Sequence, residues 1–471
     1  MKDSREIQRK QTTSCGHEGS LGEVGVERRD STEAPSISPA SERRRNDMQE
    51  VGDDLLERIL SRDNLNLGYK RVKANRGGHG VDGMKVDELL SFLKQHGKTL
   101  RQSILVGEYV PQPVRRVEIP KPDGGVRLLG IPTVVDRWIQ QAMAQELNKI
   151  FDSDFSESSY GFRPKRSAHQ AVIAARGYIE QGYRWVVDID LEKFFDRVNH
   201  DKLMALVARK VRDKRVLKLI RKYLESGIML NGVKVKSEEG TPQGGPLSPL
   251  LANVMLDNLD KELEKRGHKF CRYADDCNIY VKSKKAGERV MESITEYVEN
   301  VLKLRINRAK SAVDKPSRRK FLGFSFYIRK GIARNYIHKK PVKRFKEKVR
   351  EITSRSNGKS MDWRKEALNY LVTGWVNYFR IADMKTVAEE LDQWMRRRIR
   401  MCYWKQWKKI STKHDELVKL GVNNQKAWQF ANTRKSYWRT SSSFILSTSL
   451  TNQYLEKQGF LSLAKQLSLA Y

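Results

Sequence analysis

The sequence of 471 residues has few cysteines and histidines, and neither type occurs in a metal-binding or redox spacing. The four cysteines are Cys15, Cys271, Cys277 and Cys402, and no two of them form a CxxC pair. The eight histidines are scattered and show no HxxxH spacing. A zinc ribbon, a disulfide framework and cysteine–histidine nucleophilic catalysis are therefore poorly supported.

Long apolar runs are also missing from the sequence. No stretch approaches the roughly 18 residues that cross a bilayer. The first residues, MKDSREIQRKQTTS, contain no hydrophobic signal region. We therefore expect a protein that is neither embedded in a membrane nor secreted.

Acidic residues are scarce relative to basic ones. Asp and Glu number 57 against 91 for Lys and Arg, which gives a net charge of +34. Such an excess favours a polyanionic partner, with nucleic acid as the leading candidate and an anionic membrane surface as the second. Hydrophobic residues make up 39% of the chain, which is enough for a globular core.

The predicted elements are those of an α+β protein. Residues 1–48 are polar and predict a flexible arm. Alternation, helical periodicity and turn residues predict the next elements: strands around a Pro-Asp-Gly-Gly turn at 114–132, a helix at 136–151, a strand at 183–191, helices at 200–227 and 246–267, two strands within 270–281, a helix at 286–304 and a strand at 318–331. The order between 183 and 308 is close to a split βαβ, ferredoxin-like plan. Beyond about residue 340 the chain reads as helical and basic.

The stretch FCRYADDCNIYV places two adjacent carboxylates, Asp275 and Asp276, at the tip between two predicted strands. Aspartate is common in turns because its side chain bonds the local backbone. A second strand, VVDIDLEKFF, supplies Asp188 and Asp190, which alternation places on one face, so that periodicity cannot choose between them. The split βαβ plan puts this strand beside the hairpin and would gather three acidic groups.

Such a cluster is unfavourable unless cations compensate it, because like charges close together resist ionisation. Oxygen ligands without nearby His or Cys favour magnesium over zinc. Two such ions about 3.5–4 Å apart can stabilise the attacking 3′ oxygen and the leaving pyrophosphate in phosphoryl transfer. The sequence therefore suggests a two-metal site in a chain that binds nucleic acid.

Seven blocks of sequence occur in an order that carries a specific resemblance. They are IPKPDGGVRLLGIPT, SYGFRPKRSAHQA, VVDIDLEKFFDRVNHDKL, GTPQGGPLSPLLANV, YADD, INRAKS and FLGFSF. In order and approximate spacing they resemble the polymerase blocks of group II intron-encoded reverse transcriptases and maturases. GWVNYF resembles the maturase-specific thumb of that family, and the resemblance extends from about residue 50 to the C-terminus.

The resemblance resolves the choice between the two aspartates of the strand. In such polymerases the metal-binding aspartate precedes a bulky aromatic residue by five positions, which fits Asp190 and Phe195 but would pair Asp188 with Lys193. It implies that Asp190, Asp275 and Asp276 are catalytic and bind two Mg²⁺ ions. Phe195 would be the aromatic gate that rejects a ribose 2′-hydroxyl, and the alternative is a core aromatic like its neighbour Phe194.

Further roles are implied by the same resemblance. The residues implied to bind the incoming dNTP are Lys121, Arg127, Phe195, Gln243 and Lys310. Without the resemblance, Lys121 and Arg127 read as solvated charges on an edge strand. Template or primer contacts are implied for Phe162, Arg163, Leu322 and Gly323, the last two in the primer-grip block.

The helical region after residue 340 carries clustered arginines, and we expect RNA contacts from Arg396, Arg397, Arg398 and Arg400. Trp394, Trp404 and Trp407 lie among them. These tryptophans could stack on RNA bases. We favour a role in the hydrophobic core, because large aromatics usually anchor helix packing.

The family implies a right-hand polymerase with fingers and a ferredoxin-like palm, followed by an α-helical thumb and a small basic C-terminal domain. The expected divisions are a polar arm (1–48), N-terminal extension and fingers (49–182), palm (183–335), thumb or maturase domain (336–410) and a basic DNA-binding-like segment (411–471). No cysteine follows Cys402 and no histidine follows His414, whereas many relatives end in a Cys- and His-rich nuclease. This pattern resembles the bacterial, class C-like subclass without an endonuclease.

The implied partners are group II intron RNA, an RNA template, a DNA target or primer and dNTPs, within a ribonucleoprotein complex. The implied location is the bacterial cytoplasm, in association with the nucleoid. Two alternatives stay open. One is an RNA-binding splicing factor with a relic polymerase site, although all three carboxylates and the gate aromatic are present. The other is a related reverse transcriptase of phage defence or diversity generation, against which GWVNYF argues.

Overall fold

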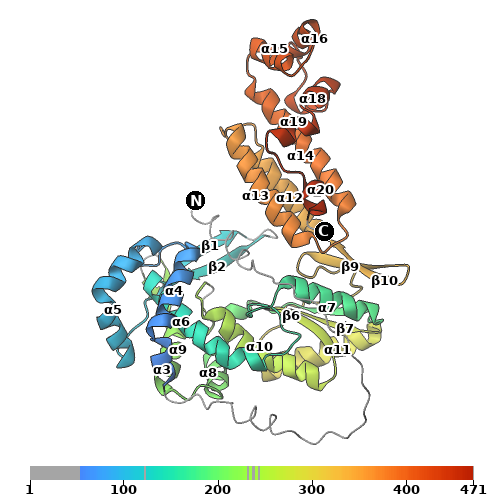
Figure 1. Cartoon of the computed structure of the whole chain (residues 1–471). Coiled ribbons are helices and arrows are strands. Elements are labelled where there is room, and N and C mark those ends of the chain that lie inside the picture. Colours follow the sequence, from blue (N-terminus) through green and yellow to red (C-terminus); the bar gives the residue numbers. More distant parts are fainter. Residues whose placement is uncertain (1–53, 121–123, 231–232, 236–238, 242–243, 470–471) are drawn as a thin grey trace, which may run out of the picture. The chain divides into compact units, whose positions relative to one another are not determined.

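The computed structural model describes residues 54–120, 124–230, 233–235, 239–241 and 244–469 (Figure 1). The polar arm, Lys121 and Gln243 lie outside the described residues. The chain forms two compact units. The first contains the described residues up to Ser167, together with Val187–Ile279 and Glu288–Ala312, and the second contains Ala168–Val186, Tyr280–Gly287 and the described residues from Val313 onward.

Helices and short strands are interspersed up to residue 314. The helices are α3 (Leu55–Ile59), α4 (Arg62–Asn75), α5 (Leu89–Leu105), α6 (Val134–Phe151), α7 (Ala168–Glu180), α8 (His200–Ala208), α9 (Lys214–Leu224), α10 (Ser248–Lys265) and α11 (Lys284–Glu296). The strands are β1 (Val114–Pro120), β2 (Val126–Ile131), β3 (Trp185–Ile189), β4 (Ile228–Leu230), β5 (Val233–Val235), β6 (Lys269–Tyr273), β7 (Asp276–Val281) and β8 (Ala312–Asp314).

From residue 324 onward a hairpin precedes a run of helices. Its strands are β9 (Phe324–Arg329) and β10 (Ile332–Ile337). The helices are α12 (Lys339–Ile352), α13 (Met361–Phe379), α14 (Lys385–Gln406), α15 (Ile410–Lys419), α16 (Asn424–Ala431), α17 (Tyr437–Thr440), α18 (Phe444–Ser449), α19 (Asn452–Lys457) and α20 (Leu463–Ser468). The predicted mixed α+β class with a helical second part is confirmed.

The sheet that carries the YADD turn has the strand order β6-β7-β3-β8. Strand β7 lies between β3 and β6, and β3 lies between β7 and β8, so each βαβ unit is split by a strand of the other. This is the split βαβ order expected from the sequence. A second sheet has the order β2-β1-β4-β5, and the short strands β4 and β5 were not predicted.

Two predicted elements are subdivided by local chemistry. The helical stretch 200–227 is two helices, and the second begins where the Asp213 side chain accepts a hydrogen bond from the Arg215 backbone N–H. The predicted strand 318–331 begins only at Phe324, because Leu322 and Gly323 both have left-handed φ values, of 51° and 88°. Two consecutive residues of this kind form a tight turn rather than extended backbone.

Aromatic and aliphatic side chains of the last helices form a core of their own. Its buried members are Trp404, Trp407, Leu417, Ala427, Ile445, Leu446 and Leu450. The prediction that Trp404 and Trp407 pack in a hydrophobic core is therefore confirmed. On α14, Asp392 accepts hydrogen bonds from the backbone N–H groups of Leu463 (2.7 Å) and Ala464 (2.9 Å), which fastens the N-terminus of α20 to α14. None of the helices among the described residues has the length and apolar character to cross a membrane.

Candidate active site

The YADD turn joins β6 to β7 and carries both adjacent carboxylates. Ala274 adopts a left-handed φ of 58°, which is uncommon for a residue with a side chain. Asp275 is half-buried in the turn, whereas Asp276 is exposed at the first position of β7. The two carboxylates therefore have different environments although they are neighbours in sequence.

A buried arginine holds this turn from the protein interior. The Arg272 Nε and Nη2 atoms donate to the two carboxylate oxygens of Asp260 on α10, at 2.7 and 2.5 Å. Its Nη1 donates to the Ala274 carbonyl and to Asn253 Oδ1, both at 3.0 Å. Arg272 and Asp260 are each 0% exposed. The guanidinium thus ties the strained residue of the turn to α10.

The segment SYGF packs backbone to backbone against the same turn. The Tyr160 N–H donates to the Arg272 carbonyl at 2.9 Å, and Asn253 Nδ2 donates to the Gly161 carbonyl at 2.9 Å. A Cβ atom on Gly161 would overlap the Ala274 nitrogen and lie 2.9 Å from the Tyr273 carbonyl carbon. Glycine is therefore required at position 161 because two backbones meet there.

Asp190 follows the last residue of β3 and is fixed through its backbone. Its N–H donates to Ser311 Oγ at 3.0 Å, and its carbonyl accepts from the Asn307 N–H at 2.8 Å. Both partners belong to the INRAKS block, and Leu191 forms an isolated bridge with Ile306 of that block. The sequence blocks around residues 190 and 306 are thus held together by backbone pairing.

The charges of the two aspartates interact. Burial raises the pKa of Asp275, and the nearby negative charge of Asp190 raises that pKa further, while Arg127 and Arg272 act in the opposite direction. The charge of Asp188 acts on the thiol of Cys277, which follows the turn. Burial raises the pKa of this thiol, and Asp188 makes a smaller contribution in the same direction. The charge of Asp190 therefore acts on the YADD turn.

The structure brings Asp190 and Asp275 close enough for their charges to interact, and Arg127 is a cation near them. Arg127 is exposed on β2 opposite Ile119 of β1. Within the described part of the chain, no group of three or more His, Cys, Asp or Glu side chains is arranged to hold a metal ion. Lys310 is exposed on the INRAKS block.

The two adjacent phenylalanines have different environments. Phe194 is 2% exposed and belongs to the core, whereas Phe195 is half-buried and meets the Phe194 ring edge-to-face at 5.2 Å. The Phe195 carbonyl accepts a hydrogen bond from the Thr241 N–H at 2.6 Å, and a Cβ on Gly240 would lie 2.8 Å from the same oxygen. The Gly-rich block therefore begins in direct contact with the backbone of Phe195.

The two candidate residues of the YGFRP block, Phe162 and Arg163, differ in exposure to solvent. Phe162 is 49% exposed, with its ring centre 6.4 Å from that of Tyr273, so it is available to a ligand. The Arg163 side chain is 3% exposed, and its guanidinium bonds Asp152 and the carbonyl of Ser156. This placement corrects the expectation of a template contact for Arg163, because the guanidinium is used inside the protein.

The predicted primer-grip residues form a turn held by α13. The Tyr378 hydroxyl donates to the Leu322 carbonyl at 2.8 Å, and a Cβ on Gly323 would lie 3.2 Å from the Phe379 ring. Both aromatic residues belong to the GWVNYF block. The two blocks that resembled a primer grip and a maturase thumb therefore contact each other directly.

The four arginines of α14 are half-buried and bond other parts of the protein. Arg396 pairs with Glu456 at 3.6 Å, Arg397 donates to the Trp438 carbonyl, Arg398 to Thr353 and Arg400 to the Leu450 carbonyl. RNA contact was predicted for these four arginines, and the structure shows that each guanidinium already bonds within the protein. These guanidinium groups fasten α14 to α12 and to the C-terminal helices, and Arg398 in addition lines a cavity.

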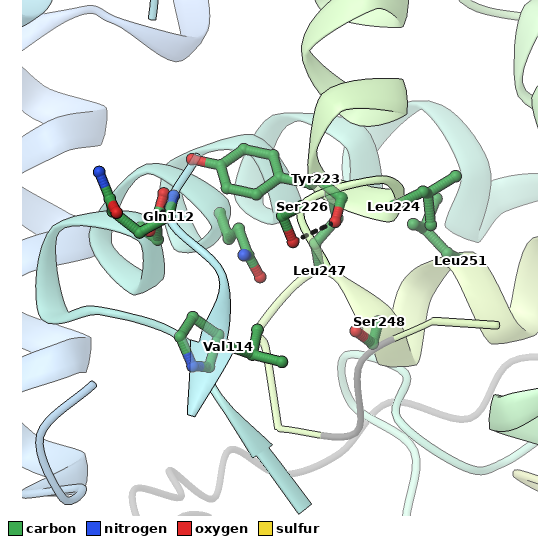
Figure 2. A pocket seen from close by; sticks show the side chains of 11 residues that line it. Gln112, Val114, Tyr223, Leu224, Ser226, Leu247, Ser248 and Leu251 are labelled. Carbon is green, nitrogen blue, oxygen red and sulfur yellow. Dashed lines mark hydrogen bonds between the residues drawn. The ribbon is translucent and has the colours of Figure 1, made fainter. Parts of the chain in front are cut away.

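A buried acidic network near the β1–β2 hairpin was not predicted. Asp136 Oδ1 accepts from the Tyr109 hydroxyl at 2.7 Å, and Oδ2 accepts from Thr133 Oγ1 at 2.7 Å and from the Gln112 N–H at 3.2 Å. Burial raises the pKa of Asp136. Figure 2 shows Gln112 and Tyr223 at the adjoining cavity of about 20 Å³, which is large enough for one water molecule. The network joins the loop before β1 to the start of α6.

Comparisons with known proteins give two family matches. The family described as reverse transcriptase (RNA-dependent DNA polymerase) matches residues 119–326. The family described as group II intron, maturase-specific domain, matches residues 342–421. The first match spans the YADD turn, Asp190 and Arg127, and the second spans α13 and α14.

Curated relatives and a solved structure were also found. Protein YkfC of Escherichia coli (strain K12) is 36% identical over 280 residues, covering 51% of this chain and 74% of YkfC. Group II intron-encoded protein LtrA of Lactococcus lactis subsp. cremoris is 30% identical over 349 residues, covering 60% of this chain and 58% of LtrA. A chain of a partial Cas6-RT-Cas1–Cas2 complex is 24% identical with a TM-score of 0.32, and the match covers 53% of this chain and 43% of that chain.

The two family matches follow each other along the chain in the order of the sequence blocks. The similarity to YkfC covers most of that relative's length. The chain therefore belongs to the family of group II intron reverse transcriptases and maturases.

Proposed function

We propose that this chain copies group II intron RNA into DNA by phosphoryl transfer at Asp190, Asp275 and Asp276, and binds the same RNA as a maturase to promote its splicing and mobility. The observation that carries the polymerase site is the electrostatic interaction of Asp190 with the half-buried Asp275 of the YADD turn. It lies within residues 119–326, which match the reverse transcriptase family. The chain spans 58% of LtrA, so substrates and partners are part of the proposal.

The donor chemistry fits magnesium. Burial and the charge of Asp190 both disfavour ionisation of Asp275. A bound divalent cation would compensate the negative charge of the ionised pair. The candidate ligands are carboxylate oxygens, which suit Mg²⁺. When bound, two Mg²⁺ ions stabilise the attacking and leaving oxygens of the displacement.

The chain's own residues would position the nucleotide. Arg127 is exposed and acts electrostatically on Asp275, which suits a cation that binds the triphosphate of a dNTP. Phe195 presents a half-buried ring beside the Gly-rich block, which suits contact with the sugar. Lys121, Gln243 and Lys310 complete the proposed nucleotide pocket, and Phe162 the proposed template contact.

The polymerase divisions expected from the sequence are part of this proposal: an arm (1–48), fingers (49–182), a ferredoxin-like palm (183–335), a thumb (336–410) and a basic DNA-binding segment (411–471). The Leu322–Gly323 turn would hold the primer end. The proposed assembly is a ribonucleoprotein of the bacterial cytoplasm, associated with the nucleoid, that also engages a DNA target. Membership of the class C-like subclass without an endonuclease stays a prediction.

The test is primer extension with dNTPs on an RNA template in Mg²⁺, with intron splicing assayed in parallel. We expect Asp275→Asn and Asp190→Asn to abolish extension and to leave splicing intact. Asp188→Asn is the matched control and should still extend, because the proposed metal site uses Asp190 rather than Asp188. If the unaltered protein promotes splicing but does not extend a primer, the alternative of an RNA-binding splicing factor with a relic polymerase site is supported instead.

A further inference from the structure

The second compact unit contains an open cavity of about 580 Å³ that the proposed function has not used. It is formed by the end of α12, the loop after it, α14 and α17. The residues that line it are Arg350, Ser354, Arg355, Ser356, Arg398, Met401, Lys405 and Trp438. Ligand sites commonly have volumes of about 300–1,000 Å³, so the cavity can admit a molecule larger than water.

The cavity is lined by four cationic side chains and by no carboxylate. Arg398 lies 5.6 Å from the Trp394 ring centre. The other three cations also lie over aromatic rings: Arg350 is 5.5 Å from the Trp394 ring centre, and Arg355 and Lys405 are 5.5 and 5.0 Å from that of Tyr437. Among the described residues, none of these three cations has an ion pair with a carboxylate. An aromatic ring orients a cation without neutralising it, so the charge stays available to an anion.

The loop at the base of the cavity is fixed before any ligand binds. Arg398 Nε donates to Thr353 Oγ1 at 2.6 Å. Arg364 Nη2 donates to the Ser354 carbonyl at 3.0 Å and to Asn357 Oδ1 at 2.7 Å. A site whose residues are already ordered loses less entropy when a ligand binds.

The cations of the cavity also disfavour one another. Burial lowers the pKa of Arg398, and the charges of Arg350 and Arg355 lower it further. A bound phosphate group would relieve this repulsion, and guanidinium groups match the geometry of phosphate oxygens.

One part of the lining is apolar and faces the same space. Met401 is 4% exposed, and Trp438 is half-buried with the Arg397 guanidinium 3.8 Å from its ring centre. A duplex presents phosphates while its bases remain paired inside. An unpaired nucleotide presents a phosphate and a base face together, and aromatic rings bind such bases by stacking.

We propose that this cavity binds one unpaired nucleotide of RNA, with its phosphates bound by Arg350, Arg355 and Lys405 and its base against Trp438. The choice of RNA rests on the proposed function, because every lining residue except Trp438 lies within the stretch 342–421 that matches the maturase-specific domain. The cavity would give the maturase a contact that distinguishes a bulged or looped nucleotide from a helix.

The proposal is tested by binding of fluorescent oligo(U), a blunt RNA duplex and oligo(dT) to the full chain. The variant R355Q/K405Q removes two cations of the cavity, and K343Q/R344Q removes two exposed cations of α12 that do not line the cavity, as a matched control. We expect R355Q/K405Q to lower affinity for oligo(U) about tenfold and to reduce the salt slope by about 0.7 for each lost phosphate contact. Affinity for the duplex should change little.

Three outcomes would overturn the proposal. They are equal losses on oligo(U) and the duplex, equal losses in the control variant, or a larger loss on oligo(dT) than on oligo(U). The last outcome would indicate a site for single-stranded DNA. Photo-cross-linking of 5-iodouridine RNA to the unaltered protein gives an independent readout, with adducts expected at Trp438 or Met401, and adducts confined to other positions would contradict the proposal.

Primer extension at saturating primer–template separates this proposal from the polymerase function. If the unaltered protein binds oligo(U) through the cavity but does not extend, the polymerase proposal fails and the cavity site stands. If it extends and R355Q/K405Q binds oligo(U) normally, the cavity proposal alone fails.

Discussion

Arg272 bonds both carboxylate oxygens of Asp260, at 2.7 and 2.5 Å, in a fully buried pair directly behind the YADD turn. Removing one partner of such a pair leaves an uncompensated buried charge, which is strongly destabilising. The same guanidinium bonds the Ala274 carbonyl at 3.0 Å. The stability of the interior and the shape of the candidate active site therefore depend on one side chain.

Arg272→Met should lower the free energy of unfolding by about 3–5 kcal/mol, because Asp260 is left buried and unpaired. Urea denaturation measures this loss. The control is Arg266→Met, which breaks a surface pair with Glu262 and should cost less than about 1 kcal/mol. Similar losses in both variants would contradict the structural role of Arg272. Iodoacetamide labelling of Cys277, which is buried in β7, should become faster in Arg272→Met only.

Gly161→Ala should abolish primer extension, because the added Cβ would overlap the backbone of Ala274 and displace the YADD turn. The matched control is Gly177→Ala on α7, where a Cβ meets nothing within 4 Å. Alanine in a helix is favoured over glycine by up to about 1 kcal/mol, so this control should be as stable as the parent or more so. Extension rates of the two variants, measured with thermal unfolding, check the prediction, and normal extension by Gly161→Ala would refute it.

Asp136→Asn should destabilise the chain by about 1–3 kcal/mol, because an amide N–H₂ replaces an oxygen that accepts hydrogen bonds. The effect should depend on pH. Burial raises the pKa of Asp136 in the folded protein, so the folded state binds this proton more tightly than the unfolded state does. Its contribution to stability is therefore fully present below the unfolded pKa of about 3.9 and is lost as pH rises through the folded value.

The measurement is the free energy of unfolding of parent and Asp136→Asn across acid to neutral pH. The difference between the two should be largest at low pH and should shrink as pH rises through that window. A constant difference would show that Asp136 has the same pKa in both states.

Mg²⁺ should stabilise the parent protein and not Asp275→Asn. A ligand that binds only the folded state adds about 2.7 kcal/mol at a concentration of 100 Kd. Thermal unfolding with Mg²⁺, and again after EDTA, measures this effect, and EDTA should also stop primer extension. Equal stabilisation of both proteins would place the bound ion away from the YADD turn.

The sequence by itself determined the elements whose cause is local. The Pro-Asp-Gly-Gly turn predicted the β1–β2 hairpin, and the alternating strands around YADD predicted β6 and β7. Order and spacing of blocks also indicated the family and the candidate carboxylates. The strands were predictable because turn chemistry and periodicity depend on neighbouring residues only.

Tertiary structure alone decided which charged groups are used inside the protein. Nothing in the sequence distinguishes Arg163 or Arg397 from a surface cation, because their partners depend on how the chain folds back on itself. The pairing of Arg272 with Asp260 and the close approach of Gly161 to Ala274 arise in the same way. Aspartates 188 and 190 were equivalent by alternation, and they differ because the strand ends between them and each meets a different neighbour in the folded sheet.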